Sequence, residues 1–211
     1  SAARARSCPA RGAGAQLAFD EEDGGFGGNQ IDTLVLMEQF GKGLVLEPFL
    51  ANIVLAGGAI KRGASKALKE SIIPKLIEGN LQLTLAYAEE QSRFDIEDVA
   101  TAAREDAGNF IINGKKSMVL NAESADKVVV VTRTSGSQVD INGISLFLVD
   151  LDNEGIERDN FPTVDGLRAS EITFKDVKVS AENLIGEKDK GFSILQEVVN
   201  DAILALSAEA V

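Results

Sequence analysis

Histidine is absent from the 211-residue sequence, and cysteine occurs once, as Cys8. Without histidine, these residues cannot build a Ser-His triad, and zinc and iron sites lose their commonest ligand, so we predict no metal site. One cysteine excludes a disulfide within the chain and gives no support for a secreted, disulfide-rich scaffold. No apolar run approaches the roughly 18–20 residues that a membrane span needs, so we expect no membrane partner.

Positive charge is also scarce. The 21 Lys and Arg residues are outnumbered by 33 Asp and Glu residues, for a formal net charge of −12. Such a surface repels the phosphates of a duplex or an anionic membrane, so we predict no nucleic-acid partner. Apolar residues make up 45% of the chain, enough for a buried core in one large domain or two small ones. We expect a cytoplasmic globular protein.

The first 14 residues contain Arg4, Arg6 and Arg11 and no acidic residue. Transit peptides have this composition, whereas a secretory signal would need an apolar centre that is missing here. We predict an irregular tail through residue 18, with a transit peptide as the alternative.

Apolar residues recur at helical spacing over residues 31–40, 49–60 and 68–76, which predicts a helical region. Pro74 lies near the end of the third stretch and should kink or stop that helix. The glycines that follow Asp20–Asp23 come after four carboxylates that would repel phosphate, so they predict a structural turn rather than a phosphate loop.

From about residue 81 the pattern changes to that of strands. Leu83–Ala88 alternates as a half-buried strand does, and Asn113-Gly114 between two apolar runs predicts a hairpin turn. Val128–Val131 and Ile144–Val149 are typical of strands buried on both faces. A change of phase near Lys175-Asp176 predicts a β-bulge, and five to seven such strands indicate a barrel or sandwich.

Helical spacing returns from Phe192 and continues to Val211, with Ser193 and Gln196 in the relation of a capping box. No stop signal precedes Val211, so we expect a fragment that ends inside a helix. The neighbouring charges of Glu89-Glu90 and Lys115-Lys116 are typical of solvated surface, and we predict no catalytic base among them.

Five segments of the sequence resemble the acyl-CoA dehydrogenase family, in the order in which that family has them. They are a Gly-rich turn, a Pro-containing link, an Asn-Gly-x-Lys segment with a following Ala-Asp, an apolar β segment, and a last β segment that leads into a helix. Their residues are Phe19–Gly28, Ile73–Asn80, Phe110–Thr134, Gly143–Asp150 and Asp165–Phe192.

The resemblance implies an α+β multidomain fold. It consists of an N-terminal α-helical domain over 1–80, incomplete and irregular through 18, a middle antiparallel β-barrel domain over 81–186, and the first helix of a C-terminal helical bundle over 187–211. It also implies an FAD-dependent acyl-CoA dehydrogenase that desaturates an acyl-CoA thioester between Cα and Cβ and passes electrons to an electron-transferring flavoprotein. We expect a homo- or hetero-oligomer, with α2β2 as one possibility.

In this family a glutamate of the C-terminal bundle takes the α proton. We expect that base beyond Val211, so no catalytic residue is assigned and the fragment is expected to be inactive alone. The resemblance implies cofactor contacts for eight residues, and substrate contact for one of them, Phe94. The eight are Leu85, Tyr87, Ala88, Glu89, Phe94, Met118, Val119 and Leu120.

At three of these positions an apolar side chain replaces a hydroxyl of the family pattern. Ala88 stands for a threonine, Phe94 for a serine, and Leu120 for the threonine whose hydroxyl faces the flavin. The alternative is therefore a non-catalytic partner subunit with degenerate flavin contacts, similar to the small subunits of dicarboxylyl- or steroid-side-chain-CoA dehydrogenases. A free-standing β-barrel binding module is a third alternative.

Overall fold

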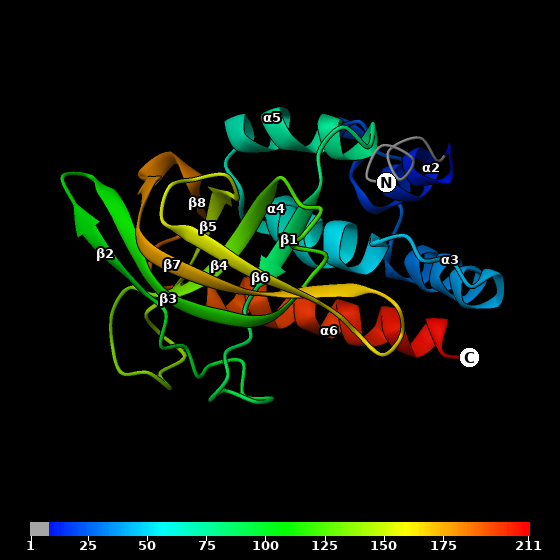
Figure 1. The fold of residues 1–211 in the computed structure, drawn as a ribbon. Coiled ribbons are helices and arrows are strands. Elements are labelled where there is room, and N and C mark those ends of the chain that lie inside the picture. Colours follow the sequence, from blue (N-terminus) through cyan, green and yellow to red (C-terminus); the bar gives the residue numbers. More distant parts are fainter. Residues whose placement is uncertain (1–8) are drawn as a thin grey trace.

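The computed structural model describes residues 9–211, which form a twisted sheet with helices against one side of it (Figure 1). The helical segments are α2 (Pro9–Ala18), η1 (Glu21–Asp23), α3 (Gln30–Gly43), the π-helix η2 (Leu50–Gly57), α4 (Gly58–Gly63), α5 (Lys66–Ile77), η3 (Ala181–Asn183) and α6 (Phe192–Glu209). The strands are β1 (Leu83–Ala86), β2 (Ala102–Asp106), β3 (Asn109–Leu120), β4 (Lys127–Arg133), β5 (Ile144–Asp150), β6 (Ile156–Pro162), β7 (Arg168–Ser180) and β8 (Leu184–Ile185).

The helical patterns of the first third and of the last segment are confirmed, with three differences in detail. Residues 9–18, expected to be irregular, form α2, while the rest of that predicted tail, residues 1–8, lies outside the described residues. Helix α5 continues past Pro74 to Ile77. In α6 the N-cap is Gly191, and its main-chain oxygen accepts from Leu195 N, so the predicted Ser193–Gln196 capping box is wrong.

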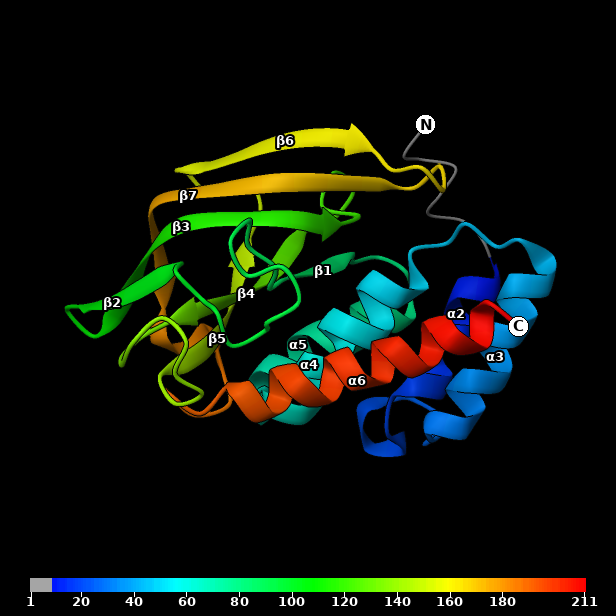
Figure 2. The same cartoon turned by 90° about the horizontal axis from the view of Figure 1, so that it is seen from below.

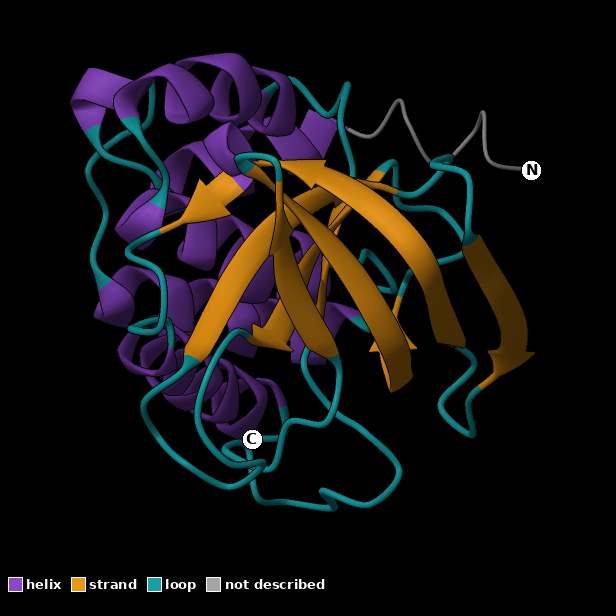
Figure 3. Cartoon of the chain, turned by 90° about the vertical axis from the view of Figure 1, so that its left-hand side faces the viewer, coloured by secondary structure: helices purple, strands orange, loops and turns teal. Residues whose placement is uncertain are grey.

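The strands form one eight-stranded sheet in the order β6-β7-β3-β2-β4-β5-β8, and β1 pairs with β4 beside this path. The α+β class is confirmed. The closed barrel is not, because within the described residues β6 and β8 are the two ends of an open sheet (Figure 3). Both β1 and β2 pair in parallel with the same edge of β4, since β5 occupies the other edge along its whole length.

Strands β4 and β5 separate two apolar cores. Alternate residues such as Val129 and Leu146 pack with β1 and the helices, whereas Val130 and Phe147 pack with residues of β3 and β7. Both faces of β4 and β5 are therefore buried, as their nearly continuous apolar sequences predict. Helix α6 lies along α3 and η2 on the helical side (Figure 2).

The predicted hairpin at Asn113-Gly114 is wrong, because both residues lie inside the continuous strand β3. The turn between β2 and β3 is instead Ala107-Gly108, and both of these residues have positive φ. Gly114 is required for close approach: a Cβ there would lie 2.6 Å from Thr101 Cα. Asn113 exchanges hydrogen bonds with Asp176, at the β-bulge of β7 that the phase change correctly predicted.

Candidate functional site

The segments expected to contact the cofactor meet where β1 ends beside β3. We call residues 87–89 and 116–120 the β1–β3 junction. Ser117 N donates to Ala88 O at 2.9 Å, and Thr84 Oγ1 donates to Leu120 O at 2.5 Å. The main chain of the two segments is therefore held in direct contact, although they lie about 30 residues apart in sequence.

A buried ion pair stands at the centre of this junction. Lys116 Nζ lies 2.7 Å from Glu89 Oε1 and also donates to Tyr87 O at 3.2 Å. Lys116 is 0% exposed and Glu89 is 4% exposed. The expectation that both belong to solvated surface is therefore wrong. It holds for their neighbours, because Lys115 and Glu90 are exposed.

Burial and charge act on this pair in opposite directions. Burial lowers the pKa of the Lys116 ammonium to about 8, against the attraction of Glu89 and together with the repulsion of Arg133. Burial raises the pKa of the Glu89 carboxyl, but the attraction and hydrogen bonds of Lys116 and the bonds from Gln91 and Thr101 outweigh it. That pKa therefore lies below its ordinary value. Both groups are charged at neutral pH.

The eight predicted site residues do not all face one place. Tyr87, Ala88 and Glu89 lie against Lys116 and Ser117 of β3. The side chain of Leu85 is buried in the helix-facing core and that of Val119 in the core between the strands, so these two can offer a ligand only main-chain groups. Phe94 lies on the turn after Glu89 with its side chain 96% exposed.

Arg133 is a residue of this region that the sequence did not suggest. Its guanidinium donates to five main-chain oxygens: Val99 O, Asp140 O, Asn142 O, Glu97 O and Gln138 O. Three of them lie in the 135–142 loop and two in the segment after Glu89. The only signal was a charge two residues after the apolar run of β4, and such a charge is also common in solvated turns.

Apolar surface and main-chain groups are what the junction offers to a cofactor. Met118 is 53% exposed, and the neighbouring Asn121 Nδ2 is buried and has no partner among the described residues. These features fit the edge and face of an aromatic ring system, which needs apolar contact and a few hydrogen-bond donors. Between Pro9 and Val211 no cluster of acidic or sulfur ligands could hold a metal ion.

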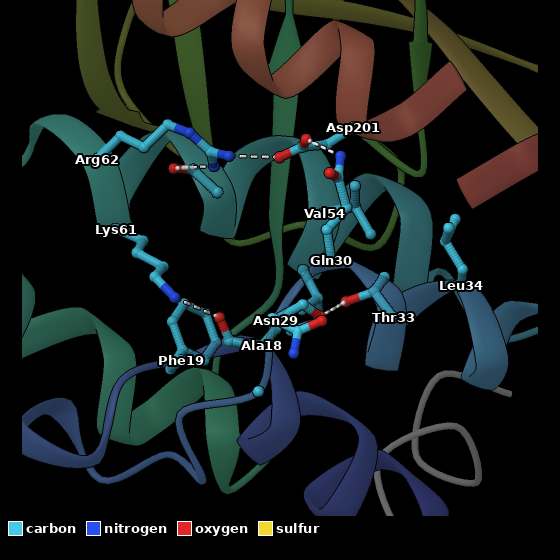
Figure 4. A pocket seen from close by; sticks show the side chains of 13 residues that line it. Ala18, Phe19, Asn29, Gln30, Thr33, Leu34, Val54, Lys61, Arg62 and Asp201 are labelled. Atoms are coloured by element: carbon cyan, nitrogen blue, oxygen red, sulfur yellow. Dashed lines mark hydrogen bonds and ion pairs between the residues drawn. The ribbon is translucent and has the colours of Figure 1, made fainter. Parts of the chain in front are cut away.

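A cavity of about 190 Å³ lies among α3, α4, α6 and the segment after α2 (Figure 4). Its charged side chains are all paired: Arg62 with Glu197 and Asp201, and Lys61 with Asp20. Gln30 Nε2 also donates to Asp201 Oδ1 at 2.6 Å. Because these groups satisfy one another, the cavity presents no free charge to a ligand.

No helix between residues 9 and 211 is long and apolar enough to cross a bilayer.

Comparison with known proteins agrees with the geometry. A family profile described as "Acyl-CoA dehydrogenase, middle domain" matches residues 84–177. The chain is 28% identical over 193 residues to the caffeyl-CoA reductase-Etf complex subunit CarC of Acetobacterium woodii, covering 89% of this chain and 51% of that protein. It is 30% identical over 200 residues to the mitochondrial long-chain specific acyl-CoA dehydrogenase of Rattus norvegicus, covering 87% of this chain and 44% of that protein.

Among solved structures, butyryl-CoA dehydrogenase from Megasphaera elsdenii superposes with a TM-score of 0.83 at 25% identity, covering 93% of this chain and 54% of the other. The chain thus spans about half the length of the relatives it matches. The profile match covers the strands that build the β1–β3 junction, and the relatives extend the similarity over the helices on both sides. The chain belongs to the acyl-CoA dehydrogenase family.

Proposed function

We propose that this chain is part of an FAD-dependent acyl-CoA dehydrogenase, which desaturates an acyl-CoA thioester between Cα and Cβ. The observation that carries the proposal is the β1–β3 junction, where the two segments with cofactor-contacting counterparts in the family lie side by side. When bound, FAD supplies the acceptor for the hydride that leaves Cβ.

The residues of this chain have a binding and positioning role in the proposal. The main chain of Met118–Leu120 and the Met118 side chain would hold the ring system, and Tyr87–Glu89 would form the adjoining wall. Phe94 would extend this surface toward the substrate. We assign the base that takes the α proton to no residue of this chain.

The proposed partners follow from the family. They are an acyl-CoA substrate, an electron-transferring flavoprotein, and further subunits in a homo- or hetero-oligomer, for which α2β2 is one arrangement. The match to a subunit of a caffeyl-CoA reductase-Etf complex supports an electron-transfer partner. We further propose that 1–80, 81–186 and 187–211 belong to an N-terminal, a middle and a C-terminal helical domain, respectively.

A second candidate function is a non-catalytic subunit that completes the site of a sister subunit. Ala88, Phe94 and Leu120 favour it, because each places an apolar side chain where the family pattern has a hydroxyl. A flavin bound here would lose up to three side-chain hydrogen bonds, each contributing roughly 0.5–1.5 kcal/mol.

The visible absorption spectrum of the protein produced from its whole reading frame tests the two candidates. Bound flavin that bleaches on addition of an acyl-CoA supports the dehydrogenase. Flavin present only after co-expression with a sister subunit supports the non-catalytic subunit. Absence of flavin in both preparations contradicts both.

A further inference from the structure

The Lys116–Glu89 pair does more than join two side chains, because the carboxylate also organises the segment after β1. Glu89 accepts from Ala100 N at 2.9 Å, from Thr101 N at 3.0 Å and from Gln91 Nε2 at 2.8 Å. Residues 89–101 therefore form a loop whose two ends meet at one carboxylate. Lys116 of β3 fixes that carboxylate and the Tyr87 carbonyl to the sheet.

Stability alone does not explain such a pair. Two buried charges lose their hydration, and apolar side chains of the same volume often stabilise a fold as well or better. What an apolar pair could not do is accept two main-chain N–H groups and bind a carbonyl at the same point. The pair fixes where the loop lies.

The Lys116–Glu89 pair fixes the position of Tyr87–Glu89, which form one side of the β1–β3 junction. Tyr87 O is bound by Lys116 itself, and Ala88 O accepts from Ser117 N, the next residue of β3. We propose that the Lys116–Glu89 pair positions Tyr87–Glu89 for cofactor binding, and that binding there requires both charges; this inference rests on the proposed function. Lys116 and Glu89 are positioning residues, with no contact to reacting atoms assigned to them.

Removing one charge leaves the other buried, and the two single variants should respond to pH in opposite directions. In Lys116→Met the carboxylate has lost its cation, so burial raises the Glu89 pKa and the closed loop favours the protonated acid. Rising pH then opens the loop, by up to about tenfold per pH unit between the ordinary pKa of the carboxyl and the raised one. The wild-type pair stays charged around neutral pH and shows little slope.

In Glu89→Gln the ammonium is the uncompensated group, and the fixed charge of Arg133 on β4 adds to its cost. Burial lowers the Lys116 pKa further, so the closed loop favours the neutral amine. Rising pH then closes the loop. The double variant Lys116→Met/Glu89→Gln carries neither charge and should show no slope in either direction.

The experiment uses the protein from its whole reading frame and measures two quantities between about pH 6 and pH 8. The first is amide hydrogen exchange of Ala100 and Thr101, corrected for the intrinsic effect of pH. The second is the dissociation constant for FAD, measured by equilibrium dialysis. Lys175→Met serves as the control. Lys175 on β7 forms an ion pair with Glu157 on β6, and both side chains are exposed, so the same substitution removes a cation that is not buried.

We expect Lys116→Met to bind FAD at least about tenfold more weakly at pH 8 than at pH 6, Glu89→Gln to show the opposite trend, and the control to match the wild type. Equal slopes in all variants would overturn the inference, as would opposite exchange slopes with unchanged FAD affinity. If Lys116→Met does not fold, the slope of Glu89→Gln decides alone. A wild-type protein that binds no FAD would overturn the proposed function instead, and the exchange slopes would still decide whether the pair positions the loop.

Discussion

Leu120 offers a test of how one side chain affects flavin binding at the β1–β3 junction. Its main-chain oxygen is bound by Thr84, so the backbone is fixed, and only the side chain differs from the threonine of the family pattern. We predict that Leu120→Thr raises flavin retention of the protein from its whole reading frame by roughly three- to tenfold, the value of one added hydrogen bond. Flavin absorbance per polypeptide after gel filtration measures this.

Leu46→Thr is the matched control for that substitution. Leu46 is 70% exposed between α3 and η2, so the same loss of apolar surface occurs away from the junction. Equal flavin content in the wild type and both variants would show that position 120 does not govern cofactor contact.

Arg133 leads to a prediction about stability. Its planar guanidinium binds five carbonyl oxygens, and a lysine ammonium has three donors that cannot reach the same acceptors. We predict that Arg133→Lys lowers the free energy of unfolding by about 2–4 kcal/mol, measured by urea denaturation. The substitution Arg104→Lys on the exposed strand β2 should change it by less than about 0.5 kcal/mol, and equal effects would contradict the role given to Arg133.

The burial of Lys116 could have been predicted from the phase of its strand. Phe110, Ile112 and Lys116 lie an even number of residues apart and share one face of β3, whereas Lys115 points outward and pairs with Glu171. The partner could not have been predicted. Glu89 reaches Lys116 only because β1 and β3 lie side by side, and the family resemblance implied a cofactor contact for Glu89 rather than this ion pair.

At the scale of the element, β3 shows how long-range pairing overrides a local turn signal. Asn113-Gly114 has the composition of a hairpin turn, yet β7 pairs along almost the whole of β3 on either side of it. Instead of forming a turn, Asn113 bonds to Asp176 of β7, and Gly114 lies close to Thr101. Periodicity located the strands and helices because burial imposes it locally, whereas turns and caps depended on contacts far away in sequence.

Gly114 supplies the prediction for this element. A Cβ at this position would lie 2.6 Å from the Cα of Thr101, a main-chain atom that cannot move away without displacing β2. We predict that Gly114→Ala lowers the free energy of unfolding by more than about 2 kcal/mol, measured by urea denaturation. Gly43→Ala at the end of α3 meets only a side-chain methyl at 3.4 Å, and we expect it to be neutral or slightly stabilising.

At the scale of the whole molecule, the class and order of the parts were predictable and the closure of the sheet was not. Helical, strand and helical periodicities follow one another along the chain, and the family resemblance agrees with that order. A sheet closes into a barrel only if its two end strands pair. Here the end strands are β6 and β8, and β8 has only two residues with which to pair. The β1–β3 junction likewise forms only in the assembled sheet, because its two segments lie about 30 residues apart in sequence.

Acid should destabilise the whole protein, with Glu89 as one identifiable cause. Its pKa is lowered in the folded state, so its contribution is present above the ordinary value of 4.5 and is lost as pH falls through the folded value. We predict that urea midpoints fall between about pH 6 and pH 3, and that Glu89→Gln is less stable than wild type at pH 6 but converges with it in acid. Parallel curves would contradict this assignment.

The pairing of β1 and β2 with one edge of β4 has a consequence for how such a site changes over time. The chain leaves that edge after β1 and returns to it at β2, and Lys116 and Arg133 hold the two ends of the intervening loop. The sheet is therefore complete whatever residues stand between these anchors. We expect natural variants to exchange the interior of this loop, Phe94 included, as an insert, and so to acquire new ligand preferences without rebuilding the fold.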